Sequence, residues 1–242
     1  MNVVEASGLG KRYGRTWALR ECTLEIPAGR VAALVGPNGA GKTTLLNLAV
    51  GLAAPSAGEV TVLGGRRAGS PAALDGIAFV AQDTPLYANL SVADMIYVTR
   101  SLNRRFDQPY AVARLAELGI PRKRKAGKLS GGQQAQLALT LALARRPRLL
   151  VLDEPVAALD PIARHDFMGT VLAAASADGV SVLLSSHVLT ELERVADYLV
   201  LMSRGRVQMA GELNDLLATH GQASLEELAL HYLRDNQTEV AK

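Results

Sequence analysis

A glycine-rich stretch between residues 36 and 44 has the residue types and the spacing to hold a phosphate group. Its sequence, GPNGAGKTT, fits the pattern G-x-x-x-x-G-K-[ST] and directly follows an apolar run at 31–35. Glycines let backbone N–H groups turn inward around an anion, and a helix after the loop adds its positive N-terminal end. Lys42 supplies a positive charge, and Thr43 offers a hydroxyl to Mg²⁺. We therefore expect a nucleoside triphosphate here, although an ordinary glycine-rich turn is the alternative. The residues expected to surround the phosphates are Gly36, Pro37, Asn38, Gly39, Ala40, Gly41, Lys42, Thr43 and Thr44.

Two carboxylates follow a second apolar run, in the stretch LLVLDEP. Asp153 and Glu154 come at its end, and a carboxylate at the C-terminal end of a buried parallel strand lies beside the crevice where such sheets bind ligands. Asp153 is placed to organise Mg²⁺, and Glu154 is placed to polarise a water molecule. Taken alone, two acidic residues after a strand are also ordinary turn residues. Together with the phosphate loop, they point to phosphoryl transfer.

The stretch LSGGQ at residues 129–133 is a candidate for a second anion site. Ser130 is suited to cap the helix that follows, and the two glycines after it leave backbone N–H groups uncovered. A helix start of this kind can hold a phosphate. The same residues are equally consistent with a flexible glycine turn. The candidate contacts are Ser130, Gly131, Gly132 and Gln133.

These residues need a sheet to bring them together, and the second half of the chain has the pattern of one. Continuous apolar runs alternate there with helical stretches, which is typical of a parallel sheet covered by helices on both faces. Asp160 followed by Pro161 is a clear helix start. The runs are 149–152, 180–184 and 198–202, and the helical stretches between them are 161–177 and 188–195.

The first part of the chain is dominated by predicted β-structure. Residues 3–13 and 18–26 alternate as short strands do, which predicts antiparallel strands beside the phosphate loop. Cys22 alternates with apolar neighbours like a core residue. After the loop, we expect a helix at 42–51 and strands at 59–63 and 77–82.

From residue 83 to residue 128 the pattern becomes helical. Ser91 and Asp94 suit a helix N-terminus, and 107–118 has helical periodicity that ends before Pro121. The next helix, 132–144, is almost wholly apolar and should be buried on most sides. A basic run between these helices is more typical of a solvated face than of a binding patch. That run contains Arg122, Lys123, Arg124, Lys125 and Lys128.

The composition excludes several classes of protein. The chain has 242 residues, 49% of them hydrophobic, so it can bury a sizeable core. Its 26 basic and 23 acidic residues are interspersed, which does not favour binding of nucleic acid. Its single cysteine excludes an internal disulfide and a cysteine-rich zinc site. We find neither the apolar core of a signal peptide nor an apolar run long enough to cross a bilayer.

Read in order, the motifs resemble those of one family. Lys42 and Thr43 in the phosphate loop, Gln82 at a strand end, LSGGQ, LLVLDEP, Asp160 in AALD and His187 in SSH occur in the order found in ABC-type ATPases. Over roughly residues 3–212, the chain resembles the nucleotide-binding subunits of ABC transporters.

The resemblance implies an α/β fold: a P-loop NTPase core, a mostly parallel sheet with helices on both faces, an N-terminal antiparallel β-subdomain and an inserted α-helical subdomain. All of 1–242 would be a single ABC ATPase domain. Residues 1–82 and 148–212 would form the core with the β-subdomain, 83–147 the helical subdomain including LSGGQ, and 213–242 a helical tail.

The resemblance also implies roles for single residues. Tyr13 would stack on adenine, the alternative being a tyrosine packed under a loop. Gln82 would touch Mg²⁺ or the attacking water, and Glu154 would act as general base. Asp160 would lie across a dimer interface, and His187 would contact the γ-phosphate. The implied catalytic set is Lys42, Gln82, Glu154 and His187, and the implied Mg²⁺ ligands are Thr43, Gln82 and Asp153.

In the family, LSGGQ of one subunit closes on the triphosphate held by another. We therefore expect ATP and Mg²⁺ as cofactors, a second nucleotide-binding subunit, separate transmembrane subunits, and a place on the cytoplasmic face of the membrane. The short helical segment and brief tail resemble exporters more than sugar importers. Two alternatives stay open: an ABC-type ATPase acting on nucleic acid or the ribosome, and a regulatory module that binds ATP without hydrolysis.

Two positions depart from the family pattern. A basic residue is usual three positions after LSGGQ, but here the residue is Gln136. Val156 is apolar where a small or polar residue is frequent. Both departures put details of the dimer interface in doubt.

Overall fold

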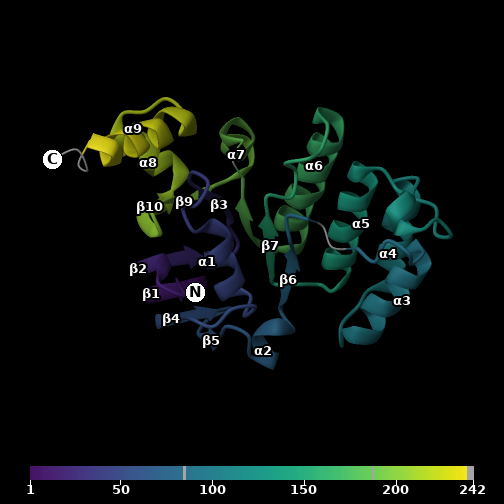
Figure 1. Cartoon of the computed structure of the whole chain (residues 1–242). Helices are drawn as coiled ribbons and strands as arrows, with labels where there is room; N and C mark the ends of the chain where they lie inside the picture. The colour runs from purple at the N-terminus through teal and green to yellow at the C-terminus, as the bar shows by residue number, and fades with distance from the viewer. Residues whose placement is uncertain (84–85, 187, 239–242) are drawn as a thin grey trace.

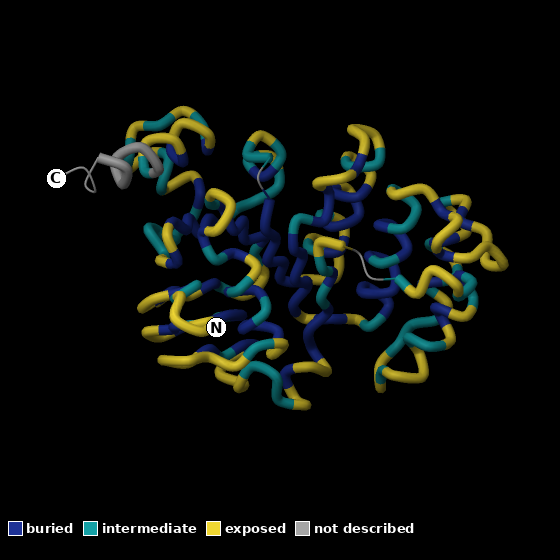
Figure 2. Tube along the Cα trace, viewed as in Figure 1, coloured by how far each residue is buried: buried dark blue, intermediate teal, exposed yellow. Residues whose placement is uncertain are grey.

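A computed structural model describes residues 1–83, 86–186 and 188–238 of the chain, with side chains up to residue 232. Within these ranges the strands form two sheets, of four and six strands, and helices surround the larger sheet (Figure 1). The strands at the centre are buried while the surrounding loops and helix ends are exposed (Figure 2). The α/β fold class predicted from the sequence is confirmed.

The smaller sheet is antiparallel and has the order β2-β1-β4-β5. Cys22, Leu24 and Ile26 alternate on its inner face and are buried, so the prediction that Cys22 packs in the core is confirmed. The strands are β1 (Asn2–Tyr13), β2 (Thr16–Pro27), β4 (Ala57–Val62) and β5 (Arg66–Arg67).

The larger sheet has the order β10-β9-β3-β8-β7-β6, in which every pair is parallel except β9 with β10. All residues of β3, β7, β8 and β9 are buried, as their continuous apolar runs predict. The sequence does not predict β10, whose residues are all partly or fully exposed. The strands are β3 (Val31–Val35), β6 (Ile77–Val80), β7 (Leu149–Asp153), β8 (Ser181–Ser185), β9 (Tyr198–Ser203) and β10 (Arg206–Glu212).

The two faces of this sheet are covered by different elements. On one face, Ala32 and Leu34 of β3 belong to a core shared with α1 (Lys42–Ala49) and the antiparallel sheet. On the other face, residues of β3 and β7 pack with α5 (Gly131–Ala144), α6 (Pro161–Asp178) and α7 (Leu189–Val195). Because both faces are covered, the five parallel strands carry polar side chains only at their ends.

The helical insert forms a third core of its own, built from α3 (Val92–Leu102), α4 (Gln108–Glu117) and one side of α5. Ser91 and Asp94 form the predicted capping box of α3. α5 is buried on most sides, as predicted, and the basic run at 122–128 is exposed at every Lys and Arg. A 3-10 turn (Ala126–Lys128) completes this region, and a short helix, α2 (Pro71–Leu74), lies outside it between β5 and β6.

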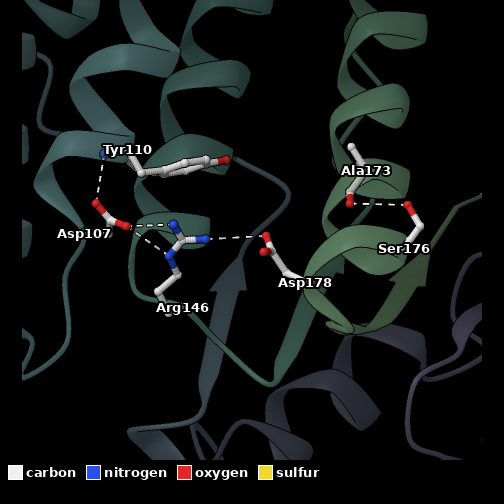
Figure 3. Close-up of polar contacts among 6 residues, drawn as sticks. All are labelled: Asp107, Tyr110, Arg146, Ala173, Ser176 and Asp178. Carbon is white, nitrogen blue, oxygen red and sulfur yellow. Dashed lines mark hydrogen bonds and ion pairs between the residues drawn. The ribbon is translucent and has the colours of Figure 1, made fainter.

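A polar cluster joins this insert to helix α6. Arg146, in the loop after α5, donates to Asp107 Oδ2 from Nε (3.2 Å) and Nη2 (2.7 Å), and its Nη1 lies 3.5 Å from Asp178 Oδ2 (Figure 3). Its guanidinium also lies over the ring of Tyr110, 5.0 Å from the centroid. One side chain thus connects the start of α4 with the end of α6.

The tail contains α8 (Leu213–His220) and α9 (Leu225–Thr238). Ser224 accepts the N–H of Glu227, but the carboxylate of Glu227 accepts the N–H of Ala223 instead of that of Ser224. Ser224 and Glu227 therefore form only half of a capping box. Leu225 and Leu228 are fully buried against the core beside α7. Among the described residues, none of the helices combines the length and the hydropathy that a membrane crossing needs.

Candidate functional site

The phosphate loop lines a cleft of about 610 Å³ at the C-terminal ends of the parallel strands. Gln82, which follows β6, and Glu154, which follows β7, face the same cleft. Residues more than 100 positions apart in the sequence are therefore brought together as predicted. The lining is Ala18, Asn38, Gly39, Ala40, Gly41, Lys42, Thr43, Thr44, Gln82 and Glu154.

Glycine is required at two positions of the loop because β2 and the end of β9 pack tightly against it. A Cβ atom at Gly36 would lie 2.3 Å from the carbonyl oxygen of Met202. Gly41 has a φ of 100°, and a Cβ there would lie 2.5 Å from a methyl carbon of Leu19. Gly41 is also the N-cap of α1, and no side chain caps this helix. Backbone N–H groups at the start of α1 are thus left available to an anion.

Lys42 is folded over the loop. Its side chain is 6% exposed, and Nζ donates to the carbonyl oxygens of Gly36 (2.8 Å) and Pro37 (3.3 Å). Nζ also lies 3.8 Å from Glu154 Oε1. A buried ammonium needs such partners, so the loop holds a positive charge at the point where phosphates would enter.

Asp153 and Glu154 are held by Ser185 at the end of the neighbouring strand β8. The Ser185 hydroxyl donates to Asp153 Oδ1 (2.6 Å), and the Glu154 N–H lies 2.9 Å from Ser185 Oγ and 3.2 Å from its carbonyl oxygen. Asp153 is 2% exposed. Glu154 has a φ of 45°, a left-handed conformation that is uncommon outside glycine and often found at functional sites.

Ser185 is a site residue that was missed in the sequence. The available signal was a pair of serines at the end of an apolar run, next to the run that carries the two carboxylates. This signal is weak, because serine after a strand is common in turns.

Tyr13 does not line the cleft. It lies at the end of β1 and is 53% exposed. Lys11 Nζ lies 5.1 Å from its ring centroid. The exposure rules out a tyrosine packed under a loop. His187 lies outside the described residues.

The Ser130 turn lies at a second cavity, of about 310 Å³, which shares no lining residue with the first. Ser130 is the N-cap of α5, and its side chain and that of Gln133 form a capping box. Asp160, the N-cap of α6, lines the same cavity and accepts the N–H groups of Ile162 and Ala163 (both 3.0 Å).

Gly131 and Gly132 differ in their surroundings. A Cβ at Gly132 would lie 2.8 Å from that of Ala163, so this glycine lets the starts of α5 and α6 approach each other. A Cβ at Gly131 would meet nothing within 4 Å. Gly131 is thus open to a ligand or a second chain.

Comparison with known proteins identifies the family. A family model described as ABC transporter matches residues 19–157, more than half of the chain. The chain belongs to the ABC transporter family. ABC ATPases bind ATP and hydrolyse it, and this chain is an ATP hydrolase of that family.

Two curated relatives differ in how much of their own length this ABC transporter family member covers. It is 32% identical over 227 residues to a lantibiotic transport ATP-binding protein, SrtF, of Streptococcus pyogenes, covering 93% of this chain and 95% of the relative. It is 36% identical over 225 residues to an Fe(3+) ions import ATP-binding protein, FbpC, of Mesorhizobium japonicum, but covers only 62% of that protein.

Solved structures agree with this ABC fold. An ATP-binding subunit of an ABC transporter matches with a TM-score of 0.85 and 27% identity, covering 95% of this chain and 98% of the other. A dimeric ATP-binding cassette in a post-hydrolysis state, bound to ADP and phosphate, matches with a TM-score of 0.77 and 25% identity, covering 87% of this chain and 98% of the other.

Proposed function

We propose that this ABC ATPase works as one half of a pair of nucleotide-binding subunits, which closes around two ATP molecules and opens after hydrolysis. The observation that supports this most is the separation of its two candidate phosphate sites. The phosphate loop lines one cleft, and the Ser130 turn lines another. In a pair, the turn of one subunit would meet the triphosphate held by the loop of the other, with Asp160 beside it.

The residues at the cleft have complementary roles in this proposal. Lys42 would place its charge on the phosphates, for which it must leave the carbonyl oxygens of its own loop. Glu154 would accept the proton of the attacking water, and Gln82 would orient that water. Tyr13 would stack on the adenine ring, and His187 would contact the γ-phosphate.

Mg²⁺ fits the donors at and beside this cleft. Thr43 and Gln82 line it and offer a hydroxyl and an amide oxygen, and Asp153, directly before Glu154, offers a carboxylate. Mg²⁺ in such sites is held by one or two carboxylates together with substrate phosphates. When bound, the ion would neutralise part of the triphosphate charge. The Ser185 hydroxyl at Asp153 Oδ1 would keep that carboxylate in place.

The test of the pair uses Glu154→Gln, which should bind ATP without hydrolysing it. We expect this variant to be monomeric without nucleotide and dimeric with Mg²⁺ and ATP, measured by size-exclusion chromatography with light scattering. Adding Lys42→Ala to the same variant should abolish the dimer, because ATP is no longer held. A Glu154→Gln chain that stays monomeric at saturating ATP, with any required partner subunit supplied, would contradict the proposal.

We further propose that the pair drives transport through separate transmembrane subunits at the cytoplasmic face of the membrane, in the direction of export. Alignment with SrtF along nearly its whole length supports a role in transport, and the short helical segment at 83–128 is the support for export. Co-purification with a polytopic membrane protein would test the partner. ATP-dependent uptake into inside-out vesicles would support export, and uptake into right-side-out vesicles would reverse the direction.

The division of the chain stays part of this proposal: a core with its β-subdomain at 1–82 and 148–212, a helical subdomain at 83–147 and a tail at 213–242. A role on nucleic acid or the ribosome remains the alternative among ABC ATPases. Nucleic-acid-stimulated phosphate release without any membrane partner would favour it.

A further inference from the structure

An ion pair outside the nucleotide cleft connects the Asp160 turn with α7. Arg164 lies one turn into α6, and its Nη2 donates to the carbonyl oxygen of Leu159, the residue before Asp160 (3.2 Å). Its Nη1 donates to Glu191 Oε1 on α7 (2.9 Å). The two side chains are only 24% and 27% exposed. One guanidinium therefore holds both the turn and the helix.

Both elements lead to the groups at the two cavities. Asp160 lines the cavity of the Ser130 turn. α7 follows β8, the strand whose Ser185 holds Asp153 and Glu154. A shift of α7 relative to α6 would thus change how the Asp160 turn is placed relative to the two carboxylates.

The ion pair leaves two polar atoms without partners. Arg164 Nε and Glu191 Oε2 are both shielded from solvent and have no hydrogen-bond partner within the described part of the chain. Buried polar atoms without partners are costly. The ion pair is therefore kept at a cost to the stability of the single chain, which favours a role other than stabilising the fold.

We propose that Arg164 and Glu191 are a positioning pair for ATP hydrolysis, which fixes the Asp160 turn to α7 so that the two move together. Neither side chain lines the nucleotide cleft, so the pair acts through the elements it connects. The inference rests on the ATPase activity. It also rests on the proposed dimer, in which Asp160 would lie beside the triphosphate of the other subunit.

The test compares Arg164→Met, Glu191→Gln and the double variant. Each single change should lower kcat about tenfold, since small misplacements of reacting groups cost at least this much. The KM for ATP should stay within about twofold, because the cleft itself is unchanged. The double variant should be no slower than the slower single variant, since both remove the same interaction. Arg164→Lys, which keeps the charge, should recover part of kcat.

Arg30→Met is the matched control. Arg30 pairs with Glu212 (3.0 Å) at the N-terminal end of β3, whereas the phosphate loop follows the C-terminal end of this strand. The loss of Arg30 should therefore leave kcat unchanged. The inference is overturned if the single changes leave kcat unchanged, if their effects multiply in the double variant, or if Arg164→Lys is as slow as Arg164→Met. Thermal unfolding of each variant is measured in parallel. If Arg164→Met does not fold, the kcat values of Glu191→Gln and Arg164→Lys test the inference.

The experiments on Arg164 and Glu191 can fail independently of the experiment on the proposed dimer. If Glu154→Gln forms the ATP-dependent dimer but the pair variants behave as wild type, only the positioning role is wrong. If Glu154→Gln fails to dimerise while the pair variants lose kcat together and non-additively, the coupling stands and the dimer is wrong.

Discussion

At the scale of single residues, Gln136 is the most unusual side chain of α5. It is 6% exposed, and both its amide nitrogen and its amide oxygen lack a hydrogen-bond partner among the described residues. It lines the cavity of the Ser130 turn, at the position where the family usually has a basic residue. Burying such an amide destabilises the single chain.

We expect Gln136→Leu to raise the free energy of unfolding by about 1 kcal/mol, because it removes two unpaired polar atoms at nearly constant volume. Thr140, one turn along the same helix, is fully buried, but its hydroxyl donates to the Gln136 carbonyl oxygen (2.7 Å). Thr140→Val should therefore lower the free energy of unfolding by about 1 kcal/mol. Urea unfolding without nucleotide measures the change in both variants. A stability loss in Gln136→Leu as large as that in Thr140→Val would show that the amide is satisfied.

The neighbouring glycines of the Ser130 turn allow a second prediction. Gly132→Ala should destabilise the chain by about 1–3 kcal/mol, because its Cβ would overlap that of Ala163 where α5 meets α6. Gly131→Ala should leave the stability of the nucleotide-free chain unchanged, since its Cβ enters open space. If Gly131→Ala still lowers the rate of phosphate release, the loss reports a ligand or second subunit at this position. Equal stability losses in the two variants would contradict the packing.

At the scale of elements, the helical insert is attached through the Arg146 cluster (Figure 3). Asp107 accepts the N–H of Tyr110 as the N-cap of α4 and also pairs with Arg146. The hydrogen bond from Tyr110 and then the one from Arg146 hold the pKa of Asp107 below its usual value. The same ion pair raises the pKa of Arg146.

The lowered pKa of Asp107 means that this carboxylate stabilises the fold more at neutral pH than at acid pH. A carboxyl whose pKa is lower in the folded chain stabilises the fold above its unfolded pKa, about 3.9, and loses this contribution as the pH falls through the folded value. Asp107→Asn should thus be less stable than wild type at pH 7, and the difference should shrink below about pH 4. Urea unfolding at several pH values measures it. Asp178→Asn, which removes only the 3.5 Å contact, should have a smaller effect. A difference independent of pH would show that the charge of Asp107 does not matter.

Most elements could be predicted from the sequence because their signals are local. The runs at β3, β7, β8 and β9 are continuous and apolar, and the N-caps Ser91, Ser130 and Asp160 carry hydroxyls or carboxylates next to their helices. β10 could not be predicted, because it is an exposed edge strand whose pairing with β9 leaves no apolar pattern. The short β5 and α2 could not be predicted either, because elements of two and four residues depend on contacts with neighbouring strands and turns.

At the scale of the whole molecule, the order of the strands decides which motifs meet. Placing β3 between β9 and β8, with β7 beyond β8, brings the phosphate loop and the Glu154 carboxylate to one cleft. The Ser130 turn lines a different cavity, together with the starts of α5 and α6. One chain therefore keeps its two candidate phosphate sites apart, which is the physical basis for proposing a pair.

The sequence by itself determined the phosphate loop, the two carboxylates and the family, because each depends on residue types at short, fixed spacing. Only the tertiary structure decided that Ser185 holds the carboxylate of Asp153 and the backbone N–H of Glu154, that the amide of Gln136 is buried without a partner among the described residues, and that Arg164 reaches Glu191. These contacts join residues 27 or more positions apart, or depend on the exclusion of water. Neither condition leaves a periodic or local signal in the chain, since both arise only when separate elements pack together.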